Sequence, residues 1–138
     1  MTTPFSTAEE RTLHAAMDRV IPADAFPGGW DAGSGEYLAR LLTGQLAHLL
    51  PAYRQGLAAL DAEARATFAQ EFADLSAEHQ DALLARIEVG EVRADWPTPP
   101  RAFFNHLVCH TAEGFYADPG NGGNRERVSW RMTGFNGT

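Results

Sequence analysis

Apolar residues recur along most of this chain at the spacing of an α-helix, and prolines and glycines divide the pattern into segments. A capping-box sequence at Ser6 to Glu9 precedes the first apolar stripe, which runs from Leu13 to Ile21 and ends at Pro22. No stretch alternates with the period of two that a half-buried strand requires. The chain is therefore predicted to be all-α, a compact bundle of five or six helices.

Pro and Gly also set the expected borders of the later helices. The loop after the first helix is expected at residues 23–35, and a stiff connector at 96–100. Between and after them, the apolar pattern predicts helices over about 36–50, from Pro51 to about Arg65, over 66–74, from Ser76 to Gly90, and over 100–115.

Composition limits the possible partners and the domain count. With 138 residues, of which 44% are hydrophobic, the chain is expected to fold as one helical domain over residues 1–138. A net charge of −7 without any Lys/Arg run argues against nucleic acid or an anionic membrane as a partner. No stretch approaches the roughly 20 apolar residues of a membrane span. The N-terminus reads as no signal peptide, so the sequence as written is expected to be cytoplasmic.

The final segment, Gly114 to Gly137, differs from the rest. Glycines cluster at 120, 122 and 123, arginines stand at 125, 127 and 131, and large aromatic residues lie between them. No helix or strand period fits, and such a segment is typical of a binding surface or of a loop packed tightly on something. We therefore expect a long irregular segment at residues 116–138 that wraps around the helical body.

One cluster has the spacing of metal ligands. His106, Cys109 and His110 fall at i, i+3 and i+4 of the last predicted helix, although a metal site would need at least one further ligand. A buried, inert thiol is the expected state of Cys109, the only cysteine. Cys109 and His110 point roughly 100° apart on a helix, which suits neither a nucleophile nor its base.

No other motif predicts an active site. No serine lies in a hydrolase signature, and no pair of acids is spaced for acid/base work. Gly120 to Asn124 could hold an anion through its backbone N–H groups, but it lacks the strand–helix context and the GK[ST] ending of nucleotide loops. The catalytic, cofactor-binding and metal sites are accordingly expected to be absent from this chain.

Four blocks of sequence, in order, carry a resemblance to a known family. They are DRVIPADAFPGGWDAG at 18–33, Tyr53-Arg54-x-Gly56-Leu57-x-x-Leu60-Asp61, the helix from Phe103-Phe104 to Thr111, and GFYADPGNGGNR at 114–125 followed by Trp130 and GF-x-G at 134–137. Together they span nearly the whole chain, and they resemble the gluconate 2-dehydrogenase subunit 3 family.

The resemblance implies a non-catalytic small subunit of a hetero-oligomeric, FAD-dependent sugar or sugar-acid dehydrogenase. Such subunits accompany a large flavoprotein of the glucose–methanol–choline type, and often a cytochrome c subunit. The implied role is to support folding, export or stability of the flavoprotein, with FAD in that partner and no cofactor here. Many members carry a twin-arginine leader, so a periplasmic location is implied if a leader has been removed or lies on a partner.

Two hypotheses follow. In the favoured one, the chain docks on a flavin-dependent oxidoreductase, and tail residues either contact the partner or hold the tail in shape. These residues are Phe115, Tyr116, Asn124, Arg125, Trp130 and Phe135. The alternative is a stand-alone helical domain that binds a metal or small ligand through His106, Cys109 and His110.

Overall fold

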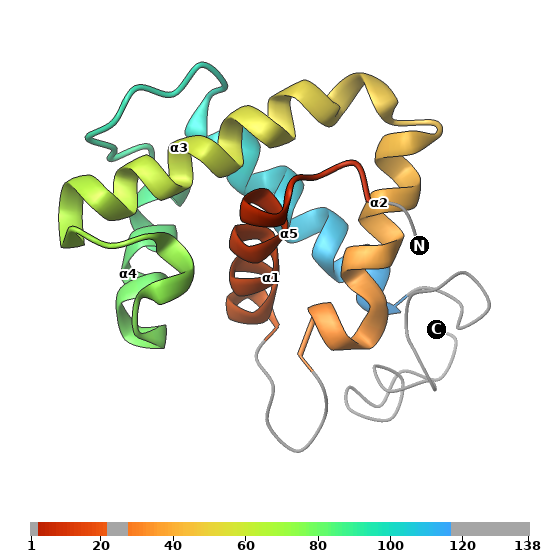
Figure 1. Cartoon of the computed structure of the whole chain (residues 1–138), viewed down its shortest axis with the longest axis horizontal. Helices are drawn as coiled ribbons and strands as arrows, with labels where there is room; N and C mark the ends of the chain where they lie inside the picture. The colour runs from red at the N-terminus through yellow and green to blue at the C-terminus, as the bar shows by residue number, and fades with distance from the viewer. Residues whose placement is uncertain (1–2, 22–27, 117–138) are drawn as a thin grey trace.

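A computed structural model describes residues 3–21 and 28–116 of the chain (Figure 1). Within these ranges the regular structure is entirely helical, so the predicted all-α fold is confirmed. Five α-helices and three short helical turns follow one another: α1 (Thr7–Val20), η1 (Trp30–Ser34), α2 (Gly35–Thr43), η2 (Ala47–Leu49), α3 (Leu50–Phe68), η3 (Phe72–Asp74), α4 (Ala77–Glu88) and α5 (Pro100–Tyr116).

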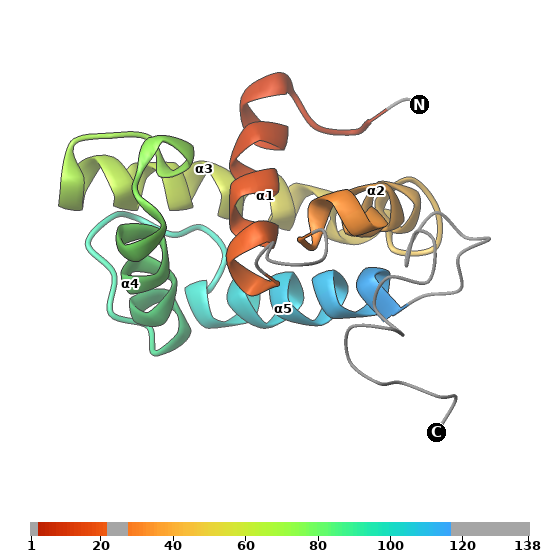
Figure 2. The ribbon, with the colours of Figure 1, turned by 90° about the horizontal axis from the view of Figure 1, so that it is seen from below.

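The helices pack around α1, which contacts each of the other four α-helices. Seen from below, α3 and α5 lie as two layers, α1 runs across α3 and reaches α5, and α4 and α2 lie at opposite ends (Figure 2). The core between these helices is built from large apolar side chains of every α-helix. The most deeply buried of them include Leu13, Met17, Leu38, Leu42, Tyr53, Leu57, Leu60, Phe72, Leu83, Ile87, Leu107 and Phe115.

The start of α1 forms as its sequence predicts. The Ser6 hydroxyl accepts a hydrogen bond from the Glu9 N–H at 3.1 Å, and the Glu9 carboxylate accepts one from the Ser6 N–H at 2.8 Å. This capping box satisfies two backbone donors that the first helical turn leaves free. Phe5, just before it, is buried and meets the Tyr53 ring edge-on with centroids 6.5 Å apart. The local sequence therefore sets where α1 begins, and the contact between Phe5 and Tyr53 of α3 orients the helix.

The prediction of one helix over 36–50 was wrong. Helix α2 ends at Thr43, because Gly44 leaves the helical region with φ −125° and ψ −119°. Residues 43–45 are exposed, so no buried face compensates for the low helix propensity of glycine there. Helix α3 then begins at Leu50 with a proline in its first turn.

The expected loop at 23–35 is also shorter than predicted, since η1 already starts at Trp30.

A separate helix over 66–74 was likewise a wrong prediction. Helix α3 continues to Phe68 and stops at Ala69, which adopts the left-handed conformation with φ +60°. Only the turn η3 follows before Ser76 caps α4 through a hydrogen bond from the His79 N–H at 3.2 Å. The predicted helices from Ser76 and over 100–115 are confirmed as α4 and α5.

The last helix leads into the segment singled out in the sequence. The expected wrapping segment, 116–138, lies outside the described residues except for the backbone of Tyr116 at the end of α5. Among the residues described, no helix combines the length and apolar character needed to cross a membrane.

Replacing Ala69 by glycine should stabilise the protein. A left-handed conformation costs an L-residue about 1 kcal/mol that glycine avoids, so Ala69→Gly should raise the free energy of unfolding by roughly that amount. Urea unfolding followed by circular dichroism measures the change. The matched control is Ala66→Gly, exposed inside α3, which should destabilise by about 1 kcal/mol. Equal destabilisation by both changes would contradict the assignment of Ala69 as the helix stop.

Candidate functional site

Helix α5 is the element on which the four sequence blocks converge. It packs against η1, α1, α2, α3 and α4, and Figure 2 shows it running beneath α1, α2 and α3. Residues of the first block lie in α1 and η1, those of the second in α3 and those of the third in α5, while the described part of the fourth block, Gly114 to Tyr116, ends α5. The surroundings of α5 therefore form the candidate site, and its contacts show what the block residues do.

The end of α5 presses closely on η1 and α2. A Cβ atom at Gly114 would lie 2.8 Å from the Cα of Ser34 and 3.0 Å from the Cβ of Tyr37, so only glycine fits at this crossing. The buried Ser34 hydroxyl donates to the carbonyl oxygen of Thr111 at 2.8 Å. This contact fixes the last turn of α5, from which the C-terminal segment departs.

Two neighbouring side chains strengthen the same junction. The Tyr37 hydroxyl donates to the Glu113 carboxylate at 3.0 Å, and burial, followed by this bond, raises the pKa of Tyr37. Phe115 is fully buried, so it packs inside this subunit. Of the tail residues predicted from the sequence, Phe115 is thus a core residue of this subunit.

The remaining tail candidates cannot be placed in the same way. Tyr116 ends α5, and Asn124, Arg125, Trp130 and Phe135 lie outside the described residues. Their roles stay predictions from the sequence.

A second crossing joins α3 to the first half of α5. At Gly56, a Cβ atom would lie 2.1 Å from the Phe103 ring, which sits directly on the α3 backbone. The Phe103 ring also contacts Tyr53 edge-on and lies against Trp96 of the α4–α5 connector. Gly56 of the second block therefore allows α3 and α5 to pack closely.

The first block is held by a carboxylate at the end of α1. Asp18 accepts the Trp30 N–H at 3.2 Å with one oxygen and faces the His14 ring nitrogen at 3.1 Å with the other. The His14 ring stacks on the Trp30 indole with centroids 4.7 Å apart. Burial raises the pKa of Asp18, although the Trp30 and His14 contacts oppose the rise. Asp18 thereby ties the start of η1 to α1.

The proposed metal ligands point into different surroundings. His110 is buried, and its Nδ1 lies 2.5 Å from the Tyr53 hydroxyl. His106 is partly exposed, whereas Cys109 is exposed, so the expectation of a buried thiol was wrong. The apolar stripe of α5 falls on Phe103, Leu107 and Thr111, and Cys109 lies off that stripe. Among the residues in view, no three His, Cys, Asp or Glu side chains gather as metal ligands would.

The Tyr53–His110 pair was missed by the sequence reasoning. In the sequence, Tyr53 stands out only as part of the second block. A tyrosine within an apolar stripe does signal that its hydroxyl will need a buried partner. The stripe does not say which residue supplies it, because His110 is 57 positions away.

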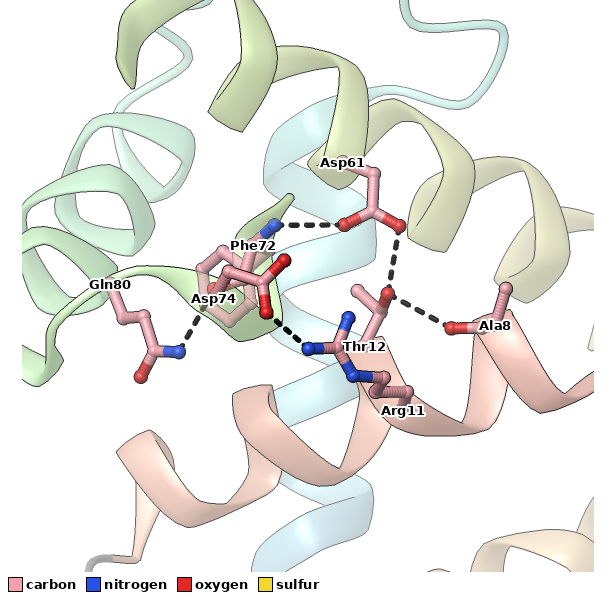
Figure 3. A network of polar contacts seen from close by, with 7 residues as sticks. All are labelled: Ala8, Arg11, Thr12, Asp61, Phe72, Asp74 and Gln80. Atoms are coloured by element: carbon pink, nitrogen blue, oxygen red, sulfur yellow. Dashed lines mark hydrogen bonds and ion pairs between the residues drawn. The ribbon is translucent and has the colours of Figure 1, made fainter. Parts of the chain in front are cut away.

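A polar network lies on the other side of α1, between α1, α3 and η3 (Figure 3). The Asp61 carboxylate of the second block accepts the Thr12 hydroxyl at 2.8 Å and the Phe72 N–H at 3.1 Å. Burial raises the pKa of Asp61, and these two hydrogen bonds oppose the rise. Beside it, Arg11 pairs with Asp74. The network fixes three elements to one another through one half-buried carboxylate.

A hollow of about 630 Å³ opens next to this network, with Leu57 and Ala58 among the apolar residues that line it. The charged groups at its rim already have partners. Arg65 binds the Glu71 carboxylate through Nη1 at 2.9 Å, as Arg11 binds Asp74. A ligand in this hollow would therefore have to displace these ion pairs.

Glu63 is a further buried charge that the sequence reasoning did not single out. Its side chain is 1% exposed, and one carboxylate oxygen accepts the Arg93 N–H at 2.7 Å, the Ala94 N–H, and the Trp96 indole N–H at 3.1 Å. Its other oxygen is buried without a partner among the described residues. Glu63 therefore fastens the connector between α4 and α5 onto α3.

Enlarging Gly56 should disrupt the α3–α5 crossing. Gly56→Ala would drive a methyl group into the Phe103 ring and should cost about 2 kcal/mol in the free energy of unfolding. Combining it with Phe103→Leu should recover part of the loss, because the smaller side chain vacates the contested space. A double-mutant cycle by urea unfolding measures the coupling. Strictly additive costs would show that the two residues do not touch.

Removing the Glu63 carboxylate should release the connector. Glu63→Ala leaves three N–H donors without their acceptor and should cost roughly 3 kcal/mol of stability. Hydrogen exchange should show lost protection at the amides of Arg93 and Ala94. Glu88→Ala, on the exposed face of α4, is the matched control and should leave both amides unchanged. Retained protection in Glu63→Ala would refute the role given to this carboxylate.

Comparison with known proteins agrees with the arrangement of the blocks. The family model described as gluconate 2-dehydrogenase subunit 3 matches residues 7–137, which includes all four blocks and every helix described above. Searches of curated proteins and of solved structures found no match. Because the family model covers nearly the whole chain, this chain belongs to the gluconate 2-dehydrogenase subunit 3 family.

Proposed function

We propose that this chain is a non-catalytic small subunit that binds and stabilises a large FAD-dependent sugar or sugar-acid dehydrogenase of the glucose–methanol–choline type. The observation that carries the proposal is the family match over residues 7–137, since the family name describes a subunit of a dehydrogenase. FAD and the catalytic residues belong to the partner in this proposal, and a cytochrome c subunit is a further candidate member of the complex.

The contacts of the block residues support an accessory role. Gly56 and Gly114 lie where helices cross closely, and Tyr53 bonds His110 in the core. All four residues are buried within this chain. Residues that act in this way hold the shape of the subunit and so of its surface, which is what a docking subunit needs.

The surface proposed for docking begins where α5 ends. The C-terminal segment carries Arg125, Trp130 and Phe135, residue types that dominate binding hot spots, with Tyr116 and Asn124 nearer its start. Its first residues follow directly on the Gly114 crossing, which is anchored to η1 and α2. A rigidly held starting point lowers the entropy that the segment loses on binding.

Co-expression with a large flavoprotein dehydrogenase encoded in the same gene cluster tests this function. The flavoprotein should be more soluble, and should retain more FAD, when this chain is present. Soluble yield, the flavin absorbance per protein and co-purification are the measurements. Equal yield and equal flavin content without this chain would refute the proposal.

Changing the tail should weaken the complex without unfolding the subunit. Arg125→Ala and Trp130→Ala together remove two hot-spot residue types, and a loss of about 2 kcal/mol in binding corresponds to a roughly 30-fold weaker complex. Binding titrations with the purified flavoprotein measure the loss. Arg101→Ala, exposed on the first turn of α5, is the matched control and should bind normally. Equal affinity of both variants would remove the tail from the interface.

A further inference from the structure

Tyr53 lies at the centre of a group of rings that joins α3 to α5. Its side chain is 1% exposed and is surrounded by Phe5, Phe103, His106 and His110, with ring centroids between 5.7 and 6.5 Å away. Two of these neighbours are imidazoles on consecutive turns of α5, and their own centroids are 5.6 Å apart. The contact between the two helices thus contains two histidine side chains beside the buried phenol.

The direction of the hydrogen bond in this group depends on the protonation of His110. Burial raises the pKa of Tyr53, so the phenol keeps its proton and can donate it to an unprotonated Nδ1 of His110, 2.5 Å away. A protonated Nδ1 cannot accept that proton and instead donates to the phenol oxygen. The described part of the chain gives the Tyr53 hydroxyl no second acceptor. Protonating His110 would therefore leave the phenol proton without a partner in a buried site.

We propose that Tyr53, His106 and His110 form a pH-sensitive latch that holds the C-terminal half of α5 against α3 at neutral pH and loosens it in mild acid. The step needs only a proton from solvent, which adds to His110 and is lost again when the pH rises.

The charges around the latch determine the direction of the effect. Burial is the main cause that lowers the pKa of His110, and a positive charge on His106 lowers it further. Glu113 of α5 acts in the opposite sense, but its carboxylate is exposed and already accepts the Tyr37 hydroxyl of α2. After burial, the negative charge of Glu113 is the next cause that favours the neutral phenol of Tyr53. Among the described residues, Glu113 is thus the carboxylate that opposes the burial charge penalty of a protonated His110.

The sign of the pH dependence follows from linkage. The folded chain binds the His110 proton at a lower pH than the unfolded chain, whose histidines titrate near pH 6.5. Acidification through that range therefore favours unfolding, and the folding equilibrium constant falls by up to about tenfold between pH 7.5 and 5.5. This window lies above the range in which carboxylates such as Glu9 and Asp81, whose pKa values are lowered, lose their charge.

The latch has a consequence for the complex, which rests on the proposed function. His110 is one turn before Gly114, where α5 is fastened to η1 and the C-terminal segment begins. Loosening α5 would free the start of that segment and remove its preorganisation. The flavoprotein should then be held tightly near neutral pH and released more readily in mild acid.

The first experiment measures the latch in the full chain without any partner. NMR titration of the imidazole protons should show His110 titrating well below exposed His79, and Tyr53→Phe should raise the pKa of His110. Urea unfolding of the wild type should show up to about a tenfold greater loss of the folding equilibrium constant between pH 7.5 and 5.5 than His110→Gln. His79→Gln is the matched control, since His79 is exposed on α4, and should behave as the wild type.

Several outcomes would overturn the latch. One is an ordinary pKa for His110 in the titration, which needs no variant and so decides the matter even if His110→Gln fails to fold. Another is an equal loss of stability in the wild type and in His110→Gln. A pull-down of the complex at pH 7.5 and 5.5 tests the regulation separately. A complex that forms but dissociates equally slowly at both values would refute the regulation and leave the proposed function intact.

Discussion

The burial of α5 is the constraint on which the rest of this structure depends. A helix that touches four other helices and η1 must offer them a small or apolar surface along its whole length, yet α5 carries His110 and Thr111 buried on its inner side. Each of these polar groups is costly to bury unless a partner is supplied. Tyr53 supplies one for His110, and Thr111 bonds back to the carbonyl oxygen of Leu107 at 2.6 Å. The positions of α3 and η1 are fixed by meeting these requirements together with the close approaches at Gly56 and Gly114.

The same constraint explains why the family resemblance and the candidate site coincide. The described parts of the four sequence blocks meet around α5, where Gly56 and Gly114 allow close approaches and Tyr53 bonds His110. Glu63 acts similarly on the connector, where one carboxylate oxygen accepts three N–H donors. Together these contacts form a frame that holds the helices of the subunit in place. The charged and aromatic residues that suit a partner follow that frame in the sequence.

Much of the local structure was predictable because its causes are local. The capping box at Ser6, the cap at Ser76 and the apolar stripes of α1, α4 and α5 act within one or two turns, so the printed sequence contains the whole interaction. The predictions failed where the local helix preference was weak and the packing between helices decided the outcome. Gly44 ended α2 because no core face lay over residues 43–45, and Ala69 stopped α3 although alanine is a strong helix former. The exposure of Cys109 was likewise decided by the side of α5 that the other helices cover.

By itself, the sequence determined the all-α class, most helix starts and stops, and the family, because periodicity, capping residues and motif order are properties of neighbours in the chain. Only the tertiary structure decided that His110 pairs with Tyr53, that Asp61 joins α1 to η3, and that His106, Cys109 and His110 face different surroundings. Those outcomes depend on which helix faces lie against each other. Helix crossings are set by the collective packing of the core, and no single segment of sequence contains that information.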